Sequence, residues 1–291
     1  MKPAPFVHHR PTSLEEALGL LEEHGEEAKV LAGGQSLVPV LNMRLAGPAH
    51  LVDINRVPDL DRVGVADGQV RVGALVRHAR LLAHDGACEA SPLLRQTLPW
   101  VAHPAIRNRG TTVGSIVHAD PSGEMPAVLA LTGGHVVLRS ADGERTVPAA
   151  EFFVAPMESV VEAGEVAIEA VFPVQPEGTS TAFTELARRH GDYALAGVAV
   201  SVQRAEAGDI EGAKASFVSL TPTPDVLDLT DALRGCEEDL QPFADAVITA
   251  VAEHVDPHDD IHGSADYRRH LAGVLTLRLL AQLTNDRKVT P

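Results

Sequence analysis

Cysteine, basic charge and long apolar runs are all scarce in this chain of 291 residues. The two cysteines, Cys88 and Cys236, stand in unrelated contexts and form no Cys-x-x-Cys motif. Because an iron–sulfur cluster usually takes four cysteine thiolates as ligands, we expect no cluster in this chain. No run of about 18 apolar residues is present, and the first residues lack the apolar core of a secretion signal. We therefore expect a cytoplasmic protein with reduced thiols and no membrane span.

The shortage of basic side chains sets the charge of the molecule. Lysine and arginine number 24 against 40 aspartates and glutamates, and the formal net charge is −16. This balance argues against nucleic acid as a partner and disfavours an anionic membrane surface. An anionic ligand would have to be held locally, by backbone amides and a few placed cations. Solubility alone also explains the acidity, and that alternative stays open.

Two glycine-bearing turns are the most informative features that the chain does contain. Residues 32–36 read Ala-Gly-Gly-Gln-Ser and follow an apolar run that predicts a strand, and residues 109–115 read Arg-Gly-Thr-Thr-Val-Gly-Ser. Glycine lets successive backbone N–H groups point into one concavity, which can cradle phosphate oxygens without a metal. The first turn alone is compatible with an ordinary strand–helix connection. Two such turns suggest a pair of loops that close on the diphosphate of one dinucleotide.

Hydrophobic periodicity predicts an α+β protein whose N-terminal units are α/β. We expect three units, residues 1–57, 58–176 and 177–291, with a linker at 173–178. The clearest element is a helix that Ser13 and Glu16 begin as a capping box and Gly25 ends. Strands are predicted at 29–32, 51–54, 69–72, 135–139, 166–172, 181–186, 194–203 and 214–220, and further helices at 37–45, 75–84, 92–101, 125–131, 225–233, 240–253 and 266–283.

The sequence gives weaker support to other kinds of functional site. Asp53 has the spacing of a ribose-binding carboxylate, but the first turn lacks Gly-x-Gly-x-x-Gly, which argues against a Rossmann site. Residues 256–262 contain metal-ligand types in a charged, proline-containing connection, and we interpret them as a solvated loop. His8, His9 and His103 are interpreted as surface or core polar residues. No Gly-x-Ser-x-Gly elbow supports a nucleophilic serine, so we expect no catalytic residue and no metal site in this chain.

Four motifs, taken together, resemble one known family. They are residues 32–37 (Ala-Gly-Gly-Gln-Ser-Leu), 106–111 (Ile-Arg-Asn-Arg-Gly-Thr), 118–121 (His-Ala-Asp-Pro) and 189–195 (Arg-His-Gly-Asp-Tyr-Ala-Leu). In order and spacing they resemble the FAD-binding medium subunit of molybdenum hydroxylases, a group that includes carbon monoxide dehydrogenase and the xanthine dehydrogenase relatives. The likeness runs nearly end to end. It implies a two-part FAD-binding domain of the PCMH type, followed by an α+β domain of the CO dehydrogenase flavoprotein type with a three-stranded antiparallel sheet.

The resemblance also implies a set of FAD-binding residues. The two turns would bind the diphosphate from two sides, and Lys29 would approach the adenosine or the phosphates. Asp120 would accept hydrogen bonds from the ribityl chain or the flavin, or else cap the helix that leads to Met125. Tyr193 would lie near the isoalloxazine ring, or else be a core tyrosine. The full set is Lys29, Leu31, Ala32, Gly33, Gly34, Gln35, Ser36, Leu37, Val101, Ala102, Ile106, Gly110, Thr111, Gly114, Ser115, Asp120 and Tyr193.

By the same resemblance the chain is an electron-transfer component. A molybdopterin large subunit would oxidise the substrate, and a small subunit would pass electrons singly through two [2Fe–2S] clusters to the FAD of this chain. The acceptor would be NAD, a quinone or oxygen, and the complex a dimer of heterotrimers. Two alternatives remain, an FAD-free scaffold on the same fold and a stand-alone flavoprotein oxidoreductase. Substrate chemistry would sit on another polypeptide.

One position departs from the family pattern. The family commonly has Thr-Ile-Gly-Gly in the second turn, whereas this chain has Val113 where glycine usually stands. A β-branched residue strongly disfavours positive φ. We expect Val113 to have extended dihedrals and the loop to bind FAD, with reduced affinity. Val113 is also the feature that favours the scaffold alternative.

Overall fold

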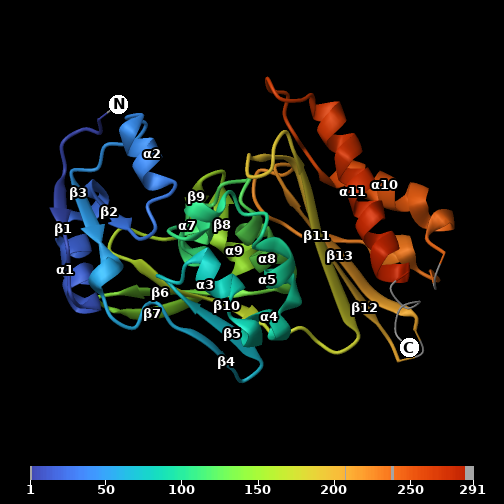
Figure 1. Cartoon of the computed structure of the whole chain (residues 1–291), viewed down its shortest axis with the longest axis horizontal. Coiled ribbons are helices and arrows are strands. Elements are labelled where there is room, and N and C mark those ends of the chain that lie inside the picture. Colours follow the sequence, from blue (N-terminus) through green and yellow to red (C-terminus); the bar gives the residue numbers. More distant parts are fainter. Residues whose placement is uncertain (1, 207, 237–238, 286–291) are drawn as a thin grey trace.

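Three main β-sheets with their helices follow one another along the chain (Figure 1). The computed structural model describes residues 2–206, 208–236 and 239–285. The extreme ends of the predicted first and last units, Met1 and residues 286–291, therefore lie outside the described residues. Within the described part, none of the helices is both long and apolar enough to cross a bilayer.

The first sheet is small and parallel. Its strands are β1 (Val7–His9), β2 (Ala28–Leu31) and β3 (His50–Asp53), in the order β1-β3-β2. Helix α1 (Leu14–His24) packs on β2 and β3, and α2 (Leu37–Asn42) follows the first glycine turn. Helices α1 and α2 and strands β2 and β3 match the predicted elements to within a few residues, whereas β1 was not predicted.

Half of the predicted capping box of α1 is present. The Ser13 side chain accepts the Glu16 N–H at 3.1 Å, and the helix ends at Gly25, whose φ is +51°. The Glu16 carboxylate, however, accepts the N–H of Thr12 at 2.7 Å instead of returning to Ser13. The helix start is therefore fixed by two polar contacts that reach one residue further upstream than a capping box does.

The second sheet is antiparallel and has the order β4-β5-β10-β6-β7. Its strands are β4 (Val63–Ala66), β5 (Gln69–Gly73), β6 (His135–Ser140), β7 (Gly143–Pro148) and β10 (Val166–Pro173). The helices of this part of the chain are α3 (His78–Leu82), α4 (Asp85–Ala90), α5 (Pro92–Thr97), α6 (Pro104–Arg107), α7 (Thr112–His118), α8 (Glu124–Thr132) and α9 (Ala149–Phe152). Two further strands, β8 (Phe153–Ala155) and β9 (Glu158–Ser159), pair with each other in a small separate sheet. Phe152, Phe172 and Leu129 lie fully buried in the core between sheet and helices.

The third sheet has one strand more than predicted. It has the order β11-β12-β13-β14, with β11 (Thr179–Ala187), β12 (Ala194–Arg204), β13 (Ile210–Val218) and β14 (Leu227–Asp228). The helix predicted at 225–233 is wrong, because Leu227 and Asp228 pair with β13 and only Asp231–Leu233 form a 3₁₀ turn. Two prolines, Pro222 and Pro224, precede this segment and favour an extended chain.

Both faces of the third sheet are covered. Helices α10 (Ala244–His254) and α11 (Ala265–Asn285) pack together, and Figure 1 shows them on the outer side of the sheet. On the other side, α5 packs on β11, and α8 packs on β12 and β13. This joint brings β12 close to α8. The fold therefore positions residues from all three sheets around one region.

Candidate functional site

A single large cleft lies where the three sheets meet. Its volume is about 1370 Å³, and it is lined by the end of β2, both glycine turns, the start of α8 and the start of β12. Every predicted FAD-binding residue except Leu31 lines this cleft. The Leu31 side chain instead lies beneath the first turn, where its Cδ1 would be 3.1 Å from a Cβ placed on Gly34. The structure thus brings together residues that are more than 150 positions apart in the sequence.

The two glycine turns touch one another. A Cβ placed on Gly33 would lie 2.7 Å from the Arg109 carbonyl oxygen, 2.8 Å from Gly110 Cα and 3.0 Å from the Thr111 nitrogen. Real Cβ atoms essentially never approach backbone so closely. Glycine is therefore required for the turns to meet. The two turns therefore lie side by side in the lining of the cleft, as a shared diphosphate site needs.

A polar network that the sequence analysis missed ties the two turns together. Asn55 Nδ2 donates to the Ala32 carbonyl oxygen at 2.8 Å and to Asp53 Oδ1 at 2.6 Å. Arg77 donates to Asn55 Oδ1 and to the carbonyl oxygen of Arg109. Asp53 therefore anchors Asn55, because its Oδ1 also accepts the backbone N–H of Asn55 at 3.0 Å. An Asp-x-Asn sequence after a strand was the available signal for this turn.

The second turn, which was expected to be a loop, contains the start of a helix. Thr111 begins α7, and its hydroxyl accepts the Gly114 N–H at 3.2 Å. The expectation of extended dihedrals at Val113 is wrong, because Val113 is the second residue of α7 and its side chain is buried at 2% exposure. A helical residue has negative φ, so valine fits this backbone without strain.

Beneath the second turn lies a buried histidine that the sequence analysis also missed. The His78 ring lines the cleft, and its Nδ1 lies 3.2 Å from the Thr112 hydroxyl. The His78 N–H donates to the Gly110 carbonyl oxygen at 3.1 Å. Burial first, and then the Arg107 guanidinium, lowers the pKa of His78 to about 4. His78 is therefore neutral near pH 7 and adds no charge beside the predicted phosphate site.

Asp120 lies at the cleft wall between α7 and α8. Its Oδ1 accepts the Ser122 N–H at 2.8 Å, and its carbonyl oxygen accepts the Gly123 N–H at 2.8 Å. These bonds hold the turn before α8, whose N-cap residue is Gly123. Asp120 therefore stabilises the turn before the helix without capping the helix itself, and it lines the cleft, so its contact with the ribityl chain or the flavin stays a prediction.

Tyr193 is not a core residue. Its exposed fraction is 73%, and it lines the cleft just before β12 begins. Partial burial, and then the Asp120 and Glu124 carboxyl groups, raise the pKa of its phenol, which therefore stays protonated at neutral pH. Close by, a Cβ on Gly191 would lie 2.4 Å from the His103 ring. This contact fixes the loop that carries Tyr193 against the middle unit.

The acidic loop at 256–262 has a structural role at the same cleft. Asp260 pairs with Arg268 at 2.6 Å and accepts the His262 N–H, and these contacts lower its pKa to about 2. Arg268 also donates to the Leu195 carbonyl oxygen at 2.8 Å, which connects α11 to β12. Asp259 accepts the Ala265 N–H at the start of α11. The carboxylates of Asp259 and Asp260 are thus engaged with backbone and arginine.

The chemistry of the cleft suits a dinucleotide better than a reaction catalysed by side chains. Both glycine turns, Ser36, Ser115 and the exposed Lys29 line it. The glycines let backbone approach a ligand where a side chain would fill the space, and about 1370 Å³ accommodates a large ligand. The residues present therefore fit FAD.

Comparison with known proteins agrees with this geometry. Residues 4–175 match the family described as the FAD binding domain in molybdopterin dehydrogenase, and residues 181–283 match the CO dehydrogenase flavoprotein C-terminal domain. The 6-hydroxypseudooxynicotine dehydrogenase complex subunit alpha of Paenarthrobacter nicotinovorans is 38% identical and is aligned over 100% of this chain and 98% of its own length. The carbon monoxide dehydrogenase medium chain of Hydrogenophaga pseudoflava is 36% identical over 96% of this chain and 97% of its own length.

Solved structures give the same result. A carbon monoxide dehydrogenase from Hydrogenophaga pseudoflava superposes with a TM-score of 0.91 at 35% identity, covering 98% of this chain and 99% of that one. Quinoline 2-oxidoreductase from Pseudomonas putida 86 gives 0.90 at 34% identity, covering 98% of both chains. Sequence and fold agree over the whole length, and the chain belongs to the FAD-binding medium subunits of the molybdenum hydroxylase family.

Proposed function

We propose that this chain receives electrons from [2Fe–2S] clusters of a small subunit and delivers them from its FAD to an external acceptor, which is NAD, a quinone or oxygen. The observation that carries the proposal is the contact of the two glycine turns at the wall of one large cleft. FAD supplies the exchange between one-electron and two-electron carriers when it is bound. The chain itself binds and orients the cofactor, so the proposal needs no acid, base or nucleophile.

We assign the predicted FAD-binding residues to different parts of the cofactor along the cleft. We propose that the turns at 32–36 and 111–115 hold the diphosphate through those backbone N–H groups that are not already bonded within the protein, and that Lys29 neutralises part of its charge. Asp120 and Tyr193 lie at the other wall, toward the third sheet, where we propose that they contact the ribityl chain and the flavin ring. Of the remaining predicted residues, Leu37, Val101, Ala102, Ile106 and Gly110 would shape the walls around the cofactor, and Leu31 would support the first turn from beneath.

We further propose two partner subunits. Relatives carry the names complex subunit, medium chain and medium subunit, which are names of parts of larger enzymes. Both cysteines of this chain are unpaired and buried, Cys88 in the middle unit and Cys236 near α10, so they do not converge on a cluster site. The clusters and the molybdenum cofactor would lie on a small and a large subunit, in a dimer of heterotrimers in the cytoplasm.

The substrate would be set by the large subunit. Relatives are named for enzymes that act on carbon monoxide, nicotine and caffeine. Because substrates this different accompany medium subunits of similar sequence, the medium subunit does not select among them. The cleft of this chain therefore does not indicate the substrate class of the complex.

Isolation of the native complex tests the proposal. We expect flavin absorbance together with iron and molybdenum in fixed proportion to this chain, and bleaching of the flavin band when the substrate of the complex is added. A colourless chain that cannot be reconstituted with FAD would instead support the scaffold alternative. A yellow chain without iron or molybdenum partners would support a stand-alone flavoprotein oxidoreductase.

A further inference from the structure

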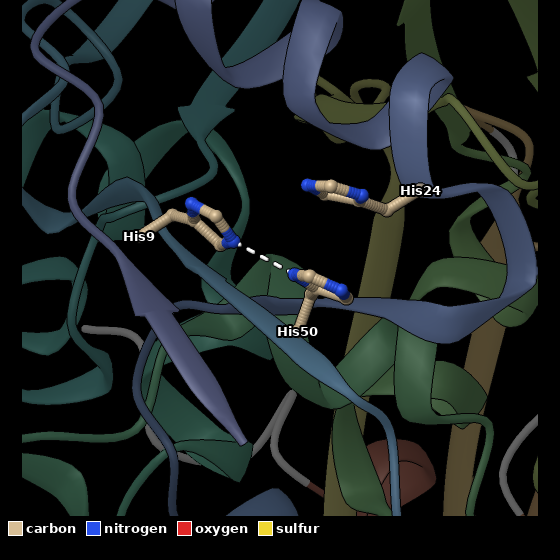
Figure 2. A group of neighbouring side chains, drawn as sticks. All are labelled: His9, His24 and His50. Atoms are coloured by element: carbon tan, nitrogen blue, oxygen red, sulfur yellow. Dashed lines mark hydrogen bonds between the residues drawn. The ribbon is translucent and has the colours of Figure 1, made fainter.

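Three histidines from three separate elements meet on one face of the first sheet (Figure 2). His9 ends β1, His24 is the last residue of α1, and His50 begins β3. Val7 stands opposite His50 in the parallel register of β1 and β3. Because side chains alternate along a strand, His9 points to the same face as His50. Helix α1 packs over the sheet and adds His24 to the group.

The rings are in direct contact. His9 Nε2 and His50 Nδ1 are 2.9 Å apart and share a hydrogen bond, which Figure 2 marks. The rings of His24 and His50 stack with centroids 3.7 Å apart and planes at 11°. One nitrogen from each of the three residues lies within 4.8 Å of the others, and all three side chains are half-buried. The interpretation of His9 as a surface or core polar residue therefore misses two partners that only the fold supplies.

The surroundings favour a bound cation. The C-terminal carbonyl groups of α1 carry partial negative charge beside His24. Glu23, the neighbour of His24 in α1, adds a carboxylate that favours positive charge at His9.

We propose that His9, His24 and His50 form a binding site for a divalent transition-metal ion, with zinc as the best match. Imidazole nitrogens suit zinc, copper and nickel, whereas calcium and magnesium prefer oxygen ligands. Bonds of about 2.0–2.1 Å in a tetrahedral site place ligand nitrogens about 3.3 Å apart. The stacked rings of His24 and His50 rotate about their Cβ–Cγ bonds on binding, a torsion with a broad energy well. Water or Glu23 completes the coordination.

This site is separate from the cleft and has a structural role. None of the three histidines lines the cleft. Strand β1 is a three-residue edge strand that pairs only with β3 among the described strands. A metal ion bound to all three residues fastens β1 and the end of α1 to the central strand. The ion therefore stabilises the first unit without taking part in electron transfer, and the proposal does not depend on the proposed function.

The test measures zinc binding by the full chain, with FAD present, after removal of metal with a chelator. We expect a single tight site in the wild type, and an affinity reduced by about tenfold or more in His50→Ala and in His9→Ala. His270→Ala is the matched control, because His270 is an exposed histidine on α11. Zinc raises the thermal unfolding midpoint of the wild type and the control, and leaves that of His50→Ala unchanged. Equal zinc affinity in the wild type and both cluster variants would overturn the proposal.

A second measurement needs no variant and so does not depend on whether the variants fold. X-ray absorption at the zinc edge of the wild-type chain with one equivalent of zinc should show three imidazole ligands. Cobalt in place of zinc should give the intense visible bands of a tetrahedral site. Zinc that carries a single imidazole, or mainly oxygen ligands, contradicts the proposed site.

Discussion

Gly33 is the residue on which the cleft geometry depends most directly. The backbone of the second turn occupies the space that any side chain at position 33 would need. Backbone cannot move aside as a flexible side chain can, so a larger residue would push the two turns apart. If the turns hold one diphosphate between them, separating them removes some of the amides from the ligand.

Replacing Gly33 with alanine should therefore weaken FAD binding. Overpacking of this kind costs about 1–3 kcal/mol, which corresponds to a loss of affinity of about 5-fold to 150-fold. Titration of the apoprotein with FAD, followed by flavin fluorescence, measures the loss. Gly64→Ala is the control, because a Cβ at Gly64 on β4 meets nothing within 4 Å. Unchanged affinity in Gly33→Ala would show that the two turns do not share the cofactor.

At Val113, in contrast to Gly33, we expect the larger side chain to be the more stable choice. Its side chain is buried in the core of the middle unit and its backbone is helical, so glycine should be worse there despite the family pattern. We expect Val113→Ala to lower the free energy of unfolding by about 2 kcal/mol and Val113→Gly by about 3 kcal/mol, the difference being the helix propensity of glycine. Urea denaturation of the three proteins measures both values. Stability or FAD affinity above wild type in Val113→Gly would mean that this position needs positive φ.

Among the elements, those with a strong local signal were predicted well and those defined by distant partners were not. Helix α1 has its own cap and apolar stripe, and its observed start and end agree with the prediction. β14 is two residues long and is a strand only because it pairs with β13, so no local sequence pattern predicts it. The sequence did not predict α7, because its glycine and β-branched residues have low helix propensity. Burial of Val113 and Ile116 in the core outweighs that low propensity.

The start of α1 offers a test at this scale. Ser13→Ala removes the oxygen that accepts the Glu16 N–H and should lower the free energy of unfolding by about 1 kcal/mol. Ser13→Asp keeps an acceptor at the same place and should remain close to wild type. Thermal or urea denaturation distinguishes the two variants. If both variants unfold alike, the contact between Thr12 and Glu16 holds the helix start by itself.

At the scale of the whole molecule, the sequence identified the lining of the cleft but not the contacts that assemble it. Family-like motifs marked the turns, Asp120 and Tyr193. The Asn55 and Arg77 bridge joins residues 22 positions apart, and the three histidines gather from three elements, so both depend on chain topology. Side chains of ordinary type at unremarkable spacing carry no signal until the fold brings them together.

The joint between the middle unit and the third sheet contains a buried acidic group with a clear pH consequence. Glu185 on β11 is 8% exposed, and its Oε2 has no hydrogen-bond partner among the described residues. Burial first, and then the Glu124 carboxyl group of α8, raises the pKa of Glu185 to about 8. An unfolded glutamate has a pKa near 4.5. Between these values the folded chain holds more protons than the unfolded chain, so this group makes stability fall as pH rises.

Glu185→Gln should therefore stabilise the protein at alkaline pH. The neutral amide removes the cost of ionising a buried carboxyl group, and we expect a gain of about 2 kcal/mol at pH 8.5 that disappears near pH 4.5. Urea denaturation at pH 5, 7 and 8.5, at a fixed FAD concentration, gives the dependence. Glu158→Gln on β9 is the control, because Glu158 is exposed. A difference between wild type and Glu185→Gln that stays constant with pH would mean that Glu185 does not titrate between the two states, and a difference that grows toward acid would reverse the assigned direction of its pKa.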